Sequence, residues 1–67
     1  MKIDYADAII KIRIKLNLSQ MALAELLGVS FTSVNRWENG KYSPTKIVKK
    51  KIELICNENN IELEELK

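Results

Sequence analysis

The chain has 67 residues and a formal net charge of +2, with 46% apolar and 30% charged residues. This length allows one small hydrophobic core, so we expect a single domain over residues 1–67, and the composition is too apolar for a disordered tail. Histidine is absent and Cys56 is the one cysteine, which excludes an internal disulfide and a zinc site.

The first two predicted helices cover residues 4–16 and 20–27. Asp4 and Ser19 are the N-cap candidates, because their side-chain oxygens can accept from free backbone N–H groups. Apolar residues recur at helical spacing at Ile9, Ile12 and Leu16, and again at Leu23, Ala24 and Leu27. Gly28 follows at the point where a chain leaving a helix commonly needs positive φ, so the second helix should stop there.

Three more helices are predicted toward the C-terminus. Ser30 is the N-cap candidate of a helix over residues 30–38, and Pro44 suits the start of a helix over residues 45–57. The apolar residues of IELEEL predict a last short helix over residues 61–66 that closes the core. The expected fold is all-α, a compact bundle of five short helices that contains a helix-turn-helix.

Charge is distributed unevenly along the chain. Residues 11–51 hold nine Lys and Arg against two Glu, a balance of +7, whereas residues 52–67 hold five Glu against one Lys, a balance of −4. This pattern indicates one face for a polyanion and another face turned away from it. The alternative interpretation is that these charges lie on helix faces that contact only solvent.

The residue types and motifs that the sequence lacks argue against several classes of protein. There is no histidine, glycine-rich phosphate loop, metal cluster, or serine or cysteine with a plausible base, so we expect neither an enzyme nor a cofactor. No small-molecule ligand site is evident. The N-terminal ten residues lack the features of a secretory signal, and no stretch has the length of a membrane span, so we expect a cytoplasmic protein that does not enter the membrane.

The most informative segment is LSQMALAELLGVSFTSVNRWENGK, residues 18–41. It predicts two short helices joined by a glycine turn, with Ala24 small enough for a close helix crossing and Gly28 at the tight turn. Val34 and Trp37 should anchor the second of these helices from below, and core anchoring is favoured over base stacking for Trp37. The outer face of this second helix is then free to enter the major groove of DNA, where the base edges carry distinguishable donors and acceptors.

The pattern LSQ…LA…LGVS…V.RWENGK..P resembles the lambda repressor and Cro family of helix-turn-helix proteins, often called the Xre-type domain, and the resemblance covers about residues 9–48. The resemblance implies sequence-specific binding to double-stranded DNA by a small transcriptional regulator, most often a repressor. The base-reading positions that it implies are Phe31, Thr32, Ser33 and Arg36. The implied backbone contacts are Gln20, Asn35, Asn39, Lys41 and Tyr42, and Gln20 could also brace a base-reading side chain.

Individual roles follow from the resemblance and from side-chain chemistry. Arg36 is the strongest candidate, because its planar fork can donate twice to guanine, although an arginine paired with an acidic neighbour is the simpler alternative. Phe31 either packs on a thymine methyl or folds back onto the protein. In the family, the pair that corresponds to Arg13 and Glu38 forms a semi-buried ion bridge with a structural role.

Partners and remaining side chains complete the interpretation. A single helix-turn-helix contacts one half-site, so we expect a homodimer, at least on a palindromic operator, with a contact surface around the fifth helix at Leu63 and Leu66. The alternative function is a protein-interaction module such as an antitoxin or anti-repressor. Cys56 is expected to be a small buried hydrophobe. Three lysines of the helix over residues 45–57 either contact DNA or are only solvated. They are Lys46, Lys49 and Lys50.

Overall fold

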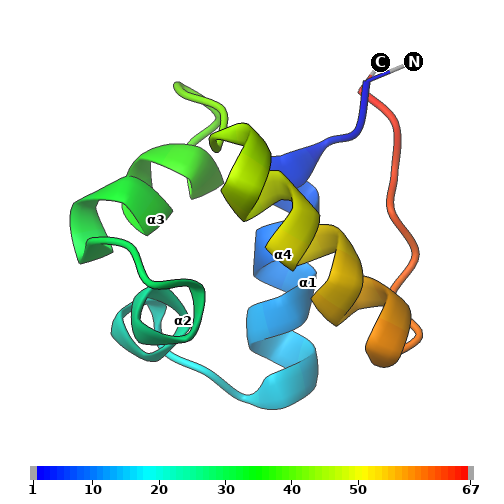
Figure 1. The fold of residues 1–67 in the computed structure, drawn as a ribbon, viewed down its shortest axis with the longest axis horizontal. Helices are drawn as coiled ribbons and strands as arrows, with labels where there is room; N and C mark the ends of the chain where they lie inside the picture. The colour runs from blue at the N-terminus through cyan, green and yellow to red at the C-terminus, as the bar shows by residue number, and fades with distance from the viewer. Residues whose placement is uncertain (1, 67) are drawn as a thin grey trace.

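In a computed structural model, which describes residues 2–66, the chain forms α1 (Tyr5–Leu16), α2 (Gln20–Leu27), α3 (Phe31–Glu38) and α4 (Lys46–Glu58). Figure 1 shows α1 and α4 at the centre of the molecule, with α2 and α3 on one side and the C-terminal segment on the other. Helix α1 packs against α3 and α4, and α2 packs against the same two helices. None of the described helices is both long and apolar enough to span a bilayer.

The hydrophobic core receives side chains from all four helices. Its fully or nearly buried members are Ala8, Ile9, Ile12, Leu23, Ala24, Leu27, Val34, Trp37, Val48, Ile52 and Cys56. Burial raises the pKa of the Cys56 thiol, because a thiolate would lose its hydration there. The cysteine therefore packs as an apolar residue, and its thiol is kept protonated.

The first four predicted helices are present, and each of their ends lies within one residue of the predicted position. Three of them begin with a side-chain cap, since Asp4, Ser19 and Ser30 each accept a hydrogen bond of 3.0–3.1 Å from the N–H three residues further on. Thr45, which precedes α4, makes no such side-chain bond.

Each helix is followed by a residue in the left-handed region, and these four residues are Asn17, Gly28, Gly40 and Asn60, with φ between 55° and 74°. In every case the next N–H donates to the carbonyl five residues back, over 2.8–3.3 Å. This is the Schellman arrangement, which satisfies carbonyls that the helix end leaves free and reverses the chain. Of these four residues, only Gly28 was predicted from the sequence to have positive φ.

The predicted fifth helix over residues 61–66 is wrong, and the structure has four helices where five were expected. The segment is extended, and two backbone hydrogen bonds of 2.7 and 2.8 Å pair it antiparallel with residues 2–4. Ile61 and Leu63 pack against the core, while the glutamates between and after them are exposed. The segment thus alternates with the two-residue period of a strand, and its backbone partners lie at the other end of the chain.

A hydrogen bond joins the start of α1 to the middle of α4. The Tyr5 hydroxyl donates to Glu53 Oε2 over 2.6 Å, and Lys49 Nζ lies 5.2 Å from the centre of the Tyr5 ring. Burial, followed by the hydrogen bond and the negative charge of Glu53, raises the pKa of Tyr5 to about 12. Folding therefore favours the neutral phenol.

This shift predicts a loss of stability at high pH. Between pH 10 and 12 the unfolded chain ionises Tyr5 while the folded chain does not, so the free energy of unfolding falls as pH rises through this window. The free energy of unfolding, measured with denaturant, should therefore fall more steeply between pH 10 and 12 for the wild type than for Tyr5→Phe. Absorbance titration of Tyr42→Phe, in which Tyr5 is the one remaining tyrosine, measures the pKa directly, and an ordinary value near 10 contradicts the prediction.

Candidate functional site

The two faces of α3 differ sharply in exposure. Val34 is fully buried and Trp37 is 8% exposed, so these residues fix the inner face against the core. On the outer face Phe31 is 47% exposed, and Thr32 and Arg36 are also exposed. Phe31 is therefore not part of the core, and about half of its surface is open to solvent beside the other outer side chains.

A row of amide side chains runs from α2 along α3. Gln20 Nε2 donates to Glu38 Oε1 over 2.9 Å, and Gln20 Oε1 accepts from Asn35 Nδ2 over 3.4 Å. Asn39 Nδ2 in turn donates to Asn35 Oδ1 over 3.2 Å. Three of the residues expected at the DNA backbone thus lie in one hydrogen-bonded row, in which Gln20 holds Asn35 in place.

The pair expected from the resemblance, Arg13 and Glu38, is in contact. Arg13 Nη1 donates to both carboxylate oxygens, over 2.9 and 3.1 Å, and Arg13 Nε donates to the Leu18 carbonyl over 3.1 Å. The two side chains are 29% and 9% exposed, so the ion pair is semi-buried. Together with the bond from Gln20, these contacts join α1, the turn after it, α2 and α3.

The remaining site residues lie at the two ends of α3. The Ser33 hydroxyl is 2.9 Å from that of Ser30, and the Ser33 N–H donates to Ser30, so this residue belongs to the cap of the helix. At the other end Lys41 and Tyr42 are exposed in the loop. The Tyr42 ring lies under Arg36, whose Cζ is 5.3 Å from the ring centre.

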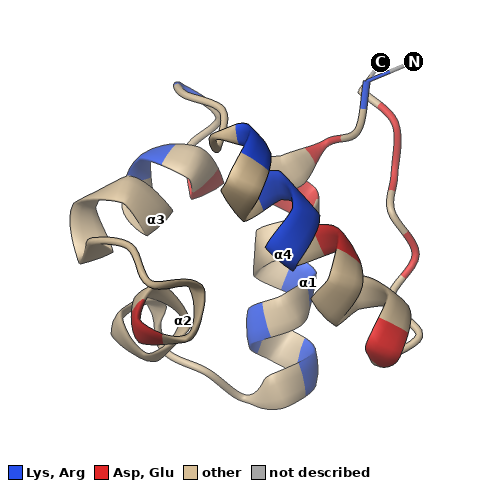
Figure 2. Cartoon of the chain, viewed as in Figure 1, with Lys and Arg blue, Asp and Glu red and all other residues tan. Residues whose placement is uncertain are grey.

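The basic side chains of α4 have several roles. Lys49 faces the Tyr5 ring, whereas Lys46 and Lys50 are exposed on α4. Lys51 Nζ donates to the Leu27 carbonyl over 3.2 Å and so stabilises the C-terminal end of α2. Sequence reasoning missed this contact, because no local pattern relates residues 24 positions apart. Figure 2 shows basic residues on α4, α1 and α3, and acidic residues on the C-terminal segment at the opposite side from α3.

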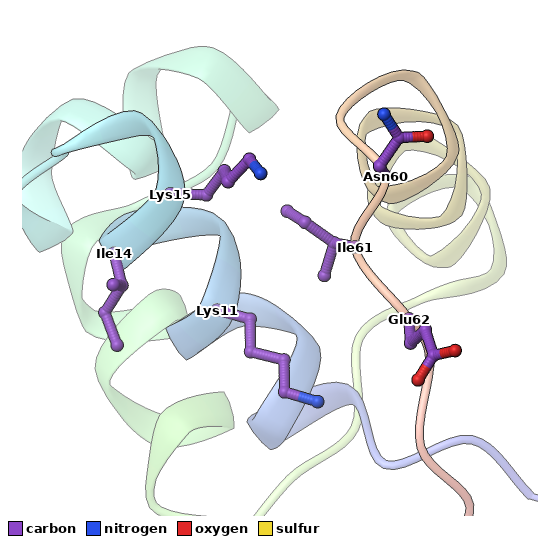
Figure 3. A pocket seen from close by; sticks show the side chains of 6 residues that line it. All are labelled: Lys11, Ile14, Lys15, Asn60, Ile61 and Glu62. Atoms are coloured by element: carbon purple, nitrogen blue, oxygen red, sulfur yellow. The ribbon is translucent and has the colours of Figure 1, made fainter.

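A shallow hollow of about 380 Å³ lies away from α3, between α1 and the segment after α4. Figure 3 shows Lys11, Ile14 and Lys15 on one side of it and residues 60–62 on the other. No residue of α2 or α3 lines this hollow. The outer face of α3 and the hollow are therefore separate surfaces.

A family model described as Helix-turn-helix matches residues 9–66, which is most of the chain. No curated protein and no solved structure matches the chain significantly. The matched span includes α3 and the other elements that position its outer face.

Removal of the Glu38 carboxylate should destabilise the fold. Glu38→Ala leaves the Arg13 guanidinium without its anion and Gln20 without an acceptor, so the free energy of unfolding should fall by about 2 to 3 kcal/mol. Denaturant unfolding measures this loss. Glu25→Ala removes an exposed glutamate on α2 as the matched control and should change it by less than about 0.5 kcal/mol. Equal effects of the two substitutions would contradict the role assigned to the ion pair.

Proposed function

We propose that this chain represses transcription by reading a specific DNA sequence in the major groove. It belongs to the helix-turn-helix family of the lambda repressor and Cro (Xre) type, whose members are DNA-binding transcription regulators. The single observation that carries the proposal is the arrangement of α3, whose inner face is buried while its outer face is exposed. An α-helix with its side chains is about 10–12 Å in diameter, and this diameter suits a major groove about 12 Å wide.

Base reading is assigned to the outer face of α3. Arg36 donates two parallel hydrogen bonds to guanine O6 and N7, and Thr32 and Ser33 contact bases through their hydroxyls. Phe31, which is exposed rather than packed in the core, contacts a thymine methyl. These four residues supply the sequence preference.

Backbone contacts flank these residues and set the orientation of the domain on the duplex. Gln20, Asn35, Asn39 and Lys41 donate to phosphate oxygens from one side of the site, and the first-turn N–H groups of α4, which Thr45 does not cap, add a further donor set. The acidic C-terminal segment lies on the opposite side of the molecule, where it does not meet the phosphates (Figure 2).

Two copies should bind one palindromic operator. Half-sites one helical turn apart are separated by roughly 34 Å, and the longest extent of the domain is 28 Å, so two copies fit side by side without overlap. The proposed contact surface cannot be a fifth helix, because residues 61–66 are extended and Leu63 packs against the core of its own chain. Leu66, at 55% exposed, remains available for such a contact.

Salt dependence and two point variants test the proposal. After selection of a preferred duplex from random sequences, Arg36→Ala should cost about 1 to 3 kcal/mol on that duplex and abolish preference at one or two base pairs. Lys41→Ala should weaken binding to all sequences alike and reduce the slope of log affinity against log salt by about 1. Lys15→Ala, an exposed charge on the wall of the hollow away from α3, is the control and should leave base preference unchanged.

Selection without an enriched motif would contradict the proposal and favour a protein-interaction module, the antitoxin or anti-repressor alternative. A changed motif for Lys41→Ala would contradict its assignment to phosphate.

Stoichiometry tests the dimer separately. Light scattering with the selected duplex should give a mass of two copies per palindromic site and one copy per isolated half-site. One copy bound to the full palindrome at saturation would contradict the dimer while leaving sequence reading intact.

A further inference from the structure

The loop after α3 returns along the last turn of that helix. Gly40, with φ of +74°, adopts the left-handed conformation, and its N–H donates to the Trp37 carbonyl over 3.0 Å. The Lys41 N–H then donates to the Arg36 carbonyl over 3.3 Å. This closure turns the chain back so that the next residue, Tyr42, comes beside the Arg36 side chain.

Tyr42 contacts Arg36 without being part of the core. The Arg36 Cζ lies 5.3 Å from the centre of the Tyr42 ring, which is the distance of a cation–π contact. Tyr42 is 59% exposed, so burial does not explain the position of its ring. The cation–π contact with Arg36 is an interaction that holds the ring on its exposed side.

Arg36 has no competing acidic partner among residues 2–66. The glutamate nearest to it in sequence, Glu38, is bound by Arg13 and Gln20, and the ion pairs of the described chain do not include Arg36. The alternative in which this arginine is merely paired with a neighbouring carboxylate therefore does not apply. Its guanidinium is held by an aromatic face.

An aromatic face constrains an arginine in a way that a carboxylate does not. A ring contacts the flat face of the guanidinium, whereas a carboxylate occupies the N–H donors at its edge. The cation–π contact therefore restricts the rotamers of Arg36 while leaving N–H donors free for guanine O6 and N7. Fixing a flexible side chain before binding reduces the entropy that binding would otherwise cost.

We propose that Tyr42 is a positioning residue for sequence recognition, whose ring holds the guanidinium of Arg36 with its donor edge directed at a guanine. This inference rests on the proposed function and replaces the phosphate contact expected for Tyr42 from the family resemblance. Tyr42 acts through the arginine, and its hydroxyl is not required.

Paired variants on the selected duplex test the inference. Tyr42→Leu removes the aromatic face and should weaken binding to that duplex about 2- to 5-fold, with the preference at the base pair that Arg36 reads reduced by the same factor. Tyr42→Phe keeps the ring and should retain wild-type affinity and preference. In the Arg36→Ala background, Tyr42→Leu should have no further effect. A random-sequence duplex should bind Tyr42→Leu and the wild type equally.

A measurement without DNA separates this inference from the proposed function. The ring current of Tyr42 should shift the Arg36 side-chain proton resonances in the free protein, and Tyr42→Leu should abolish the shift and increase the mobility of Arg36 Nε. Absence of the shift in the wild type would overturn the inference alone. Wild-type discrimination by Tyr42→Leu, or equal weakening of Tyr42→Phe and Tyr42→Leu on every duplex, would also overturn it. Failure to select any motif would overturn the proposed function and base reading by Arg36 with it.

Discussion

The ion pair between Arg13 and Glu38 holds the three helices of the recognition unit in one arrangement. Glu38 is the last residue of α3, and it receives donors from α1 and from the first residue of α2. Arg13 uses its remaining edge to hold the Leu18 carbonyl, so the turn between α1 and α2 is fixed by the same side chain. A semi-buried pair of charges that is also held by hydrogen bonds to Gln20 and to the Leu18 carbonyl tolerates little displacement, which makes the orientation of α3 well defined.

This constraint extends from the scaffold to the surface that we assign to DNA. Glu38 binds one end of the Gln20 amide, and the other end of that amide holds Asn35. A change at the ion pair would therefore alter side-chain positions on α3 as well as stability. Directly after α3, Gly40 reverses the chain and brings Tyr42 to Arg36, so side chains of the C-terminal half of α3 are positioned by contacts from outside the helix.

The chain also separates its charges in space. Pairing of residues 61–66 with residues 2–4 keeps the acidic segment beside the N-terminus, away from α3 (Figures 1 and 2). An acidic tail that lay near α3 would repel phosphate, and its docking on the opposite side avoids this repulsion. Backbone pairing at the ends of the chain thus affects the electrostatics around the outer face of α3.

Local signals in the sequence determined the four helices, because caps such as Ser19 and stops such as Gly28 act on backbone groups within a few residues. The same string, LSQ to WENGK, determined the family and the outer residues of α3. The extended form of residues 61–66 was decided by backbone partners some 60 positions away, which no local periodicity reports. The exposure of Phe31, the bond from Lys51 to α2 and the cation–π contact between Arg36 and Tyr42 were likewise decided by tertiary structure. Each of them depends on how helices pack and how a loop returns, and these contacts exist only once the core has formed.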